Sequence, residues 1–521
     1  MRPLKSMLLA ASLTAILFGL TSADRLAAPR ALAPNYPADS LAGRIQRLLA
    51  VPAAERALPL ALADEPAVQA FYTQRQHSAA WCADAGAGPK GRAALALLTQ
   101  ASDYGLTPAV YHVPLLKALA DSLAQPAGTA GQVARQARFD VLLTDGVVLF
   151  ARHLRRGQLH AFTPSPLEKA GAPFEPAAWV ARALAAPGFA AALLRCQPPQ
   201  REYRELQKAL ARWRRQPATG NDAPAHRRRS QQMALTLERW RWEAIPGSEY
   251  LLVNLPAYQL EVVRKGRVQL SQRIMIGRPD RPTPTLNSRV TSFTIAPEWN
   301  VPHDVAVRHI LPYLKANARY APEQDFLANN NYRLFDAQGK AVNPATVNWQ
   351  RVTVTNFPYT IRQSPGCGNL LGNIIFRFPN PYGLYLSDAP EPGQFAHAYR
   401  ALEEGCMKLA RPMHLAAYLL GPDSTSAALP TEAQCTANPQ PRTIFLKRPL
   451  PLHVRYATCA VVAGRLRFYP DVYGLDATLR RQLLAMQAAA QRSALPSLRQ
   501  RKDATENQPP GTTLAGQREE R

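Results

Sequence analysis

The sequence predicts an α+β protein in which a helical half is followed by a β-rich half. In the first half, apolar residues recur at spacings of three and four, which is typical of amphipathic helices. From Tyr250 onward they alternate with a period of two, which is typical of half-buried strands. A chain of 521 residues is too long for one ordinary hydrophobic core, so we expect more than one domain.

The N-terminus has the pattern of an export signal. Arg2 and Lys5 precede an apolar run over residues 7–20, which is too short to span a bilayer comfortably, and small residues follow at Thr21-Ser22-Ala23. We therefore predict a signal peptide over residues 1–23, export to the periplasm or cell envelope, and no membrane span after cleavage. An uncleaved anchor is the alternative.

The formal net charge of +25 predicts an affinity for polyanions, such as nucleic acid, anionic lipid or an acidic wall polymer. Because an exported protein rarely meets nucleic acid, we expect no nucleic-acid partner and favour the wall or the membrane surface. None of the 6 cysteines forms a CxxC pair, so a structural zinc site is not expected. Disulfides can form in an oxidising compartment, with a connectivity that the sequence leaves open.

The first half divides into a lead-in and a helical domain. Residues 24–67 are rich in Ala, Pro and Arg, and we predict a loose lead-in there. Residues 68–213 are predicted to form the helical domain. Within it, residues 139–154 are apolar around most of the circumference, which indicates a buried helix, whereas residues 203–213 show one apolar face. Residues 214–230 contain Pro, Gly and three consecutive Arg, and are predicted to be an exposed linker.

Residues 231–480 are predicted to form the β-rich domain, entered through a short helix that ends near Trp240 and Trp242. Helices are expected at 303–314 and 412–420, and a polar, irregular stretch extends to residue 343. The tail at residues 490–521 is charged and is predicted to be disordered. The predicted strands cover residues 251–255, 258–263, 267–276, 291–295, 352–355, 374–378, 384–386, 443–446 and 454–462.

The sequence Glu404-Gly405-Cys406 carries the candidate chemistry. Glycine before a cysteine permits a tight turn, which can aim consecutive backbone N–H groups at one point and so form an oxyanion hole. A thiol beside such donors can act as a nucleophile. A cysteine that is only a small buried hydrophobic residue is the alternative interpretation.

These residues also carry a family resemblance. The segments 385–390 (YLSDAP) and 404–408 (EGCMK) resemble the signature of L,D-transpeptidases with a YkuD-type catalytic domain, in particular the large scaffold-bearing murein enzymes. Further similar segments are 104–112 and 238–242 in the scaffold part and 278–284, 297–302, 362–366 and 471–476 in the catalytic part.

The resemblance implies a helical scaffold domain followed by a catalytic domain with a capping insertion at 303–343. It implies that Cys406 attacks peptidoglycan peptide stems, that N–H groups at Gly405 and Cys406 hold the oxyanion, and that no metal or cofactor is needed. It also implies that Tyr385 lines the cleft. It further implies that Glu404 and Lys408 contact the substrate.

Three residues depart from the family pattern. The family's general base, a histidine, falls on Ser387, and a hydroxyl is not a base near neutral pH. A carboxylate at Glu404 would raise the pKa of the thiol by like-charge repulsion. Lys408 replaces an arginine and lacks its bidentate fork. Replacement bases to consider are His397, His414 and Glu404 itself.

Two functions remain open at this stage. The first is an L,D-transpeptidase that forms 3→3 cross-links through a thioester, with hydrolysis of the same acyl-enzyme as a variant. The second is an inactive protein whose cleft holds peptidoglycan stems or an envelope protein partner. Residues 214–230 are too few to hold the peptidoglycan-binding module of the large members, so we expect the basic surface to contribute to wall association. A Cys367–Cys406 disulfide is a further alternative.

Overall fold

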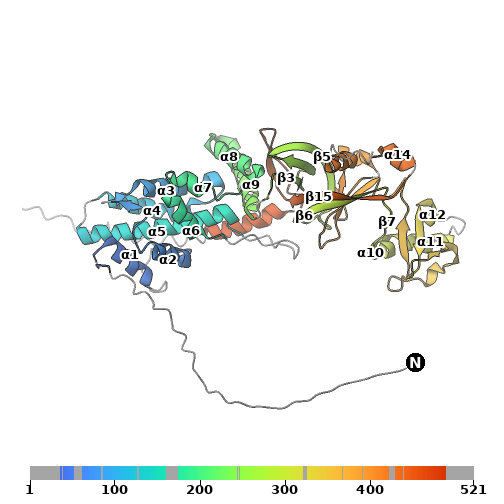
Figure 1. Ribbon diagram of the computed structural model, residues 1–521, viewed down its shortest axis with the longest axis horizontal. Helices are drawn as coiled ribbons and strands as arrows, with labels where there is room; N and C mark the ends of the chain where they lie inside the picture. Colours follow the sequence, from blue (N-terminus) through green and yellow to red (C-terminus); the bar gives the residue numbers. More distant parts are fainter. Residues whose placement is uncertain are drawn as a thin grey trace, which may run out of the picture.

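The computed structural model describes residues 36–488, apart from gaps at 38, 52–61, 84–85, 126–127, 160–173, 243–244, 246, 321–325, 367, 390, 422–428 and 438. The described chain is elongated, with a helical part at one end, a β-rich part in the middle and a small mixed unit at the other end (Figure 1). The predicted order of a helical part before a β-rich part is confirmed. The predicted signal peptide at 1–23 and the tail at 490–521 lie outside the described residues.

The helical part is built around α5 (Thr129–Arg156), which contains the predicted buried stretch. Its residues 139–154 are buried almost without exception, because helices pack on it from several sides. Two short strands, β1 (Cys82–Ala83) and β2 (Gly86–Ala87), accompany these helices. The surrounding helices are α1 (Leu41–Ala50), α2 (Glu65–Gln74), α3 (Pro89–Thr99), α4 (Val113–Leu123), α6 (Pro176–Ala185) and α7 (Phe189–Leu194).

The prediction that residues 24–67 form a loose lead-in is wrong for α1. The Ser40 side chain accepts the N–H of Gly43 and caps this helix. Ile45 and Leu49, one turn apart, are buried in the core of the helical part. The composition of the segment concealed a short amphipathic pattern that the rest of the helical part stabilises by burial.

The predicted linker at 214–230 is also wrong in its second half. Helix α8 (Arg201–Arg215) is followed by a 3-10 turn, η4 (Gly220–Asp222), and α9 begins at once (Ala223–Trp242). Pro224 is compatible with a helix here because it occupies the first turn, where the backbone N–H has no intrahelical partner.

The β-rich part is a closed sheet of nine strands in the order β13-β5-β14-β12-β11-β6-β15-β3-β4, and an additional pairing of β4 with β5 closes it. Most neighbours are antiparallel, but β12 pairs with β14, β13 with β5, and β15 with β3 in parallel. The strands are β3 (Glu249–Asn254), β4 (Gln259–Arg264), β5 (Arg267–Gly277), β6 (Leu286–Ile295), β11 (Ile374–Arg377), β12 (Tyr385–Ser387), β13 (Ala401–Glu403), β14 (Met407–Leu409) and β15 (Arg442–Arg455). Helices α13 (Pro412–Leu420) and α14 (Glu432–Ala437) and a hairpin of β16 (Cys459–Val462) and β17 (Arg465–Phe468) complete this part.

The mixed unit has its own four-stranded sheet, in the order β7-β10-β8-β9, and its own hydrophobic core. Its outer strands in the sequence are β7 (Trp299–Asn300) and β10 (Thr360–Gln363), so the unit extends beyond the predicted range of 303–343 at both ends. The strand predicted at 352–355 is absent, because Thr353 bonds locally to Asn356 in a turn. The other elements are α10 (His303–Val305), the π-helix η5 (Ala306–Ile310), α11 (Leu311–Tyr320), α12 (Phe326–Asn329), β8 (Tyr332–Phe335) and β9 (Ala341–Val342).

Helix α9 joins the helical part to the barrel. Glu238 is 1% exposed and accepts the N–H groups of Gln158 and Leu159 at 2.5 and 2.7 Å, just after α5 ends. Gly157 makes this approach feasible, since a Cβ at that residue would lie 2.6 Å from the Glu238 carboxylate. Arg239, on the next position, forms an ion pair with buried Asp476 near the end of the described chain.

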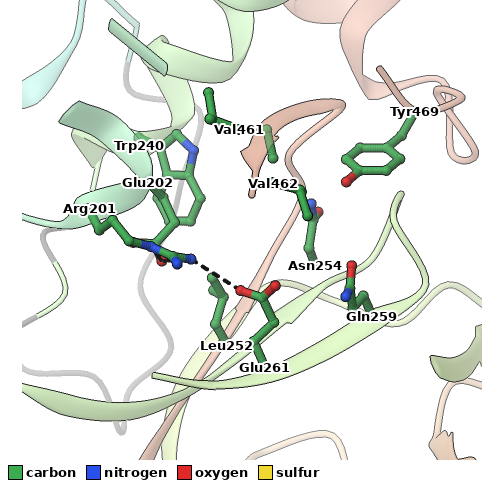
Figure 2. Close-up of a pocket in the computed structure, with 11 residues that line it drawn as sticks. Arg201, Glu202, Trp240, Leu252, Asn254, Gln259, Glu261, Val461, Val462 and Tyr469 are labelled. Carbon is green, nitrogen blue, oxygen red and sulfur yellow. Dashed lines mark hydrogen bonds and ion pairs between the residues drawn. The ribbon is translucent and has the colours of Figure 1, made fainter. Parts of the chain in front are cut away.

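The seam between α8 and the barrel holds a small cavity of about 40 Å³, lined by both apolar and charged residues (Figure 2). Arg201 on α8 forms an ion pair with Glu261 on β4 across this cavity, at 3.2 Å. Burial raises the pKa of Glu261, and the charge of Arg201 opposes that effect. The two halves are therefore joined by polar contacts as well as by apolar packing. Within the described residues, no helix combines the length and the apolar character needed to cross a membrane.

We predict that Glu238→Ala destabilises the chain by about 3–5 kcal/mol, because it leaves two buried N–H groups without an acceptor and Arg241 without its buried partner. Urea denaturation followed by circular dichroism measures the change. Glu391→Ala, at an exposed position, is the control and should change the stability by less than about 0.5 kcal/mol. Equal midpoints for the two variants would contradict this account of the seam.

Candidate active site

Cys406 lies on the tight turn between β13 and β14. Gly405, just before it, has a φ of +99°, which favours glycine over any residue with a Cβ. The turn passes close to the end of β5, where a Cβ on Gly277 would lie 2.9 Å from the Gly405 Cα. Two glycines are thus needed for the backbone to carry the thiol at this place.

Thr283 fixes this turn from the loop that follows β5. Its hydroxyl accepts the N–H of Gly277 at 2.9 Å and donates to the carbonyl of Gly405 at 2.7 Å. The hydroxyl of Tyr473 donates to the Gly277 carbonyl at 2.7 Å and accepts the Thr283 N–H at 3.2 Å. Two segments distant in the sequence, residues 277–283 and Tyr473, therefore hold the Cys406 turn through buried and partly buried hydrogen bonds.

The Cys406 thiol is half-buried, and the backbone N–H and the hydroxyl of Tyr385 on β12 are the donors that act to lower its pKa. These donors and the charge of Lys408 favour the thiolate, whereas burial and the charge of Glu403 oppose it. Burial is the largest of these effects, and the pKa of the thiol is raised. The pKa of Tyr385 is also raised, by its own burial and then by the neighbouring sulfur.

Glu403 is the carboxylate that faces the thiol. Its side chain forms an ion pair with Lys408 at 3.4 Å, and the two side chains are only 17% and 15% exposed. Burial raises the pKa of Glu403, and Lys408 opposes that effect. Glu404 instead points outward, where it forms ion pairs with Arg278 at 2.5 Å and with Arg281 at 3.9 Å.

We expected Glu404 to raise the pKa of the thiol, but the carboxylate that does so is Glu403. The turn at Gly405 sends consecutive side chains in different directions, and the two arginines of the 278–281 loop attract the second carboxylate. Lys408, expected at the substrate, has an internal partner in Glu403.

Ser387 occupies the position of the family histidine and is fully buried. It pairs with Lys408 in the parallel register of β12 and β14, one residue beyond Leu386 and Met407, which belong to the barrel core. Its hydroxyl donates to the carbonyl of Asp388 at 3.0 Å. The Asp388 carboxylate in turn accepts N–H groups of Asn373 and Ala389 at 2.9 and 2.8 Å. The side chains of Ser387 and Asp388 thus form hydrogen bonds with the backbone.

The two histidines considered as replacement bases, His397 and His414, are both exposed, at the end of the 3-10 helix η8 (Pro392–Ala396) and on α13 respectively. Among the described residues, no imidazole is hydrogen-bonded to Cys406. Cys406 is a free thiol, and Cys367 lies outside the described residues. In that same part of the chain no group of His, Cys, Asp or Glu is arranged to hold a metal ion.

A cleft of about 390 Å³ separates the mixed unit from the edge of the barrel next to this site. Its volume falls in the range of ligand pockets. One wall is π-helical, a rare conformation that is frequent at functional sites. The lining residues are Arg281, Trp299, Asp304, Val305, Arg308, His309, Ile310, Tyr313, Phe326, Asn330, Tyr332, Leu370 and Glu404.

Sequence reasoning did not single out His309, which lines this cleft opposite Glu404. Its only signal was a position within the helix predicted at 303–314. Glu404 reaches the cleft, whereas Tyr385, Cys406 and Lys408 form a cluster beside it. The cluster presents a half-buried thiol beside donors, and the cleft presents cationic, acidic and aromatic groups next to it.

Comparisons with known proteins match two segments of the chain. Residues 66–210 match the model of a scaffold domain, and residues 248–426 match the YkuD model, an L,D-transpeptidase catalytic domain. A curated protein of Haemophilus influenzae, a putative L,D-transpeptidase, is 30% identical over 248 residues, which are 47% of this chain and 48% of that protein. The chain therefore spans about half the length of this relative.

Two solved structures show a weaker likeness. An L,D-transpeptidase from Mycobacterium smegmatis has a TM-score of 0.18 and 14% identity, over 40% of this chain and 58% of that one. L,D-transpeptidase 1 of Mycobacterium tuberculosis has a TM-score of 0.15 and 13% identity, over 40% of this chain and 61% of that one.

We predict that Glu403→Gln lowers the pKa of the Cys406 thiol, because it removes an anion and leaves the charge of Lys408 to the sulfur. Alkylation requires the thiolate, so the pH at which the labelling rate of Cys406 begins to rise should be lower in the variant than in the native protein. The labelling rate at pH 7 should therefore increase several-fold. The assay is iodoacetamide labelling followed by mass spectrometry of the Cys406 peptide. Glu404→Gln is the matched control and should shift the profile less; an equal shift would assign the effect to net charge.

We also predict that Thr283→Val, which keeps the side-chain shape, destabilises the fold by about 1–3 kcal/mol, because two buried hydrogen bonds are lost. Hydrogen exchange should accelerate at Gly277 and around Cys406. Thr346→Val is the control, since its hydroxyl bonds at an exposed turn. Unchanged exchange near Cys406 would show that Thr283 does not hold the turn.

Proposed function

We propose a peptidoglycan-directed function for this chain, which belongs through residues 248–426 to the YkuD family of L,D-transpeptidase catalytic domains and carries a scaffold domain at residues 66–210. The proposed substrate is the tetrapeptide stem of the wall polymer, and the proposed nucleophile is Cys406. The observation that carries this proposal is the thiol on the Gly405 turn, which receives the N–H and O–H of Tyr385.

The proposed reaction has two acyl transfers. The Cys406 sulfur attacks the carbonyl carbon of the third stem residue, a C–S bond forms, and the fourth residue leaves as its amine with a proton. A side-chain amine of a second stem then attacks the thioester carbonyl, a C–N bond forms, the C–S bond breaks, and the proton lost by the amine returns to the Cys406 sulfur. The product is a 3→3 cross-link. The N–H groups near Gly405 and Cys406 are the proposed oxyanion donors, since the positive φ of Gly405 favours such a turn.

Three further residues have proposed roles in this reaction. Tyr385 stabilises the thiolate, because both of its donors reach the sulfur. Lys408 adds a positive charge that favours the same form. Glu404 contacts the stem from the rim of the cleft that it lines. The mixed unit is the proposed cap over the substrate. Because peptidoglycan lies outside the cytoplasmic membrane, the proposed location is the envelope.

The rate of this reaction should be low. A positioned general base contributes typically about 10²–10⁴-fold in rate, and the described part of the chain offers Cys406 no imidazole. Burial also keeps the thiol protonated near neutral pH.

A second candidate function is supported by the position of Ser387. Its hydroxyl is committed to the Asp388 carbonyl, so no side chain at the family's base position addresses the thiol. This arrangement favours a protein that holds peptidoglycan stems, or an envelope partner, without turnover. The two candidates differ in whether a covalent adduct forms on Cys406.

Acylation by a carbapenem distinguishes the candidates. We predict that the native protein acquires the adduct slowly and that Ser387→His combined with Glu403→Ser acquires it about 100-fold faster, because the base returns and the anion beside the thiol is removed. Mass spectrometry of the intact protein over time measures this, with Cys406→Ala in each background as the control. Rapid acylation of the native protein would contradict the slow rate and direct attention to His309, His397 and His414. No gain in the folded double variant would favour the stem-holding function.

A further inference from the structure

We propose that the exposed tip of the α8–α9 hairpin, called the arginine tip here, binds the carboxylates of peptidoglycan stems outside the Cys406 site. This inference rests on the proposed function, which makes peptidoglycan the polymer that the chain meets. The hairpin stands at the border of the helical part and the barrel, whereas the cleft lies toward the mixed unit at the far end (Figure 1). The residues of the arginine tip are Arg212, Arg214, Arg215, Arg227, Arg228 and Arg229, all of them exposed.

The arginine tip carries more positive charge than its surroundings neutralise. Asp103 forms ion pairs with Arg214 and Arg215 at 3.7 and 3.3 Å. Arg212, Arg227 and Arg228 form no ion pair with any carboxylate of the described residues. The last turn of α8 is basic, which suits the negative end of the helix dipole, but that preference does not account for three arginines in the first half of α9.

The backbone under these side chains is fixed. Trp213 donates its indole N–H to the carbonyl of His226 at 3.3 Å, and the His226 ring lies 2.9 Å from the carbonyl of Trp213. The two rings stack at 4.9 Å with an interplanar angle of 11°. Arg229 lies over the ring of Phe468 on β17, at 5.2 Å, which attaches the tip to the β16–β17 hairpin. A platform that is ordered in advance loses less entropy when it binds a ligand.

Carboxylates are the chemistry that this surface recognises best. A guanidinium presents a planar fork that binds a carboxylate in a bidentate manner, and the wall polymer of the proposed function repeats such groups along its length. A bilayer is a poorer fit, because surface helices that bind membranes insert exposed Trp, Phe or Leu. None of the exposed large hydrophobic residues of the described chain lies on α8 or α9, and Trp213 is half-buried against His226.

Co-sedimentation of the purified full chain with isolated sacculi tests the proposal. The tip variant is Arg212→Gln, Arg227→Gln and Arg228→Gln, since these three side chains have neither an ion pair nor a packed ring. The matched control removes three exposed charges from the barrel, as Arg442→Gln, Lys447→Gln and Arg448→Gln. If each lost arginine–carboxylate pair has the strength typical of exposed ion pairs, the tip variant should bind sacculi about tenfold more weakly at low salt. Added salt should weaken the binding of the native chain. The control should bind as the native chain does.

Two further binding experiments test whether wall carboxylates are the ligand. Sacculi whose carboxylates have been amidated should bind the native chain as weakly as untreated sacculi bind the tip variant. Vesicles of phosphatidylglycerol and phosphatidylcholine should show little difference between the native chain and the tip variant. Equal loss in the tip and control variants, or a loss confined to vesicles, would overturn the proposal. Carbapenem acylation of the tip variant should equal that of the native chain, so a failure of the Cys406 chemistry and a failure of the arginine tip give different results.

Discussion

The contacts of α9 are the constraint on which the remaining architecture depends. Within a few residues, this helix contacts the end of α5 through Glu238, the segment after β17 through Arg239 and Asp476, and the flanks of the β16–β17 hairpin through Gln232. Its arginine at position 241 is fully buried and donates to the carbonyl of Tyr104 in the helical part. Removing one partner of a buried ion pair is strongly destabilising, so these contacts favour one relative orientation of the two halves of the chain.

Buried polar contacts between distant segments also shape the candidate site. The Cys406 turn is held by Thr283 and Tyr473, which do not touch the sulfur, and the sulfur is contacted by Tyr385. Its protonation is decided by a balance in which burial outweighs two hydrogen bonds and a lysine. The backbone that positions the Cys406 thiol is thus fixed, whereas the burial of the thiol favours its neutral form. The position of the thiol and its protonation are separate properties, because Thr283 and Tyr473 fix the first whereas burial and Tyr385 act on the second.

The sequence predicted those parts of this arrangement that depend on local pattern. The all-round apolar stretch of α5 and the Gly-Cys turn need only neighbouring residues to be recognised. The sequence could not predict that Glu403 and Glu404 point in different directions. Glu404 is oriented by its ion pairs with Arg278 and Arg281, which belong to a loop distant in the sequence. His309 was missed for the same reason, since its importance comes from the barrel edge opposite it. Helix α1 was missed because only the helical core stabilises so short an amphipathic segment.

The mixed unit, which forms most of the cleft wall, has a hydrophobic core separate from that of the barrel. The residues from Val301 to Ile361 pack among themselves, and the barrel core contains none of them. Neither core has to be repacked when the distance between the walls changes, so the mixed unit can turn as a rigid body about its two connections to the barrel. Opening and closing is then a hinge motion whose amplitude is set by those connections. Under the proposed function, such a hinge would admit a branched polymer sideways, without threading a free chain end.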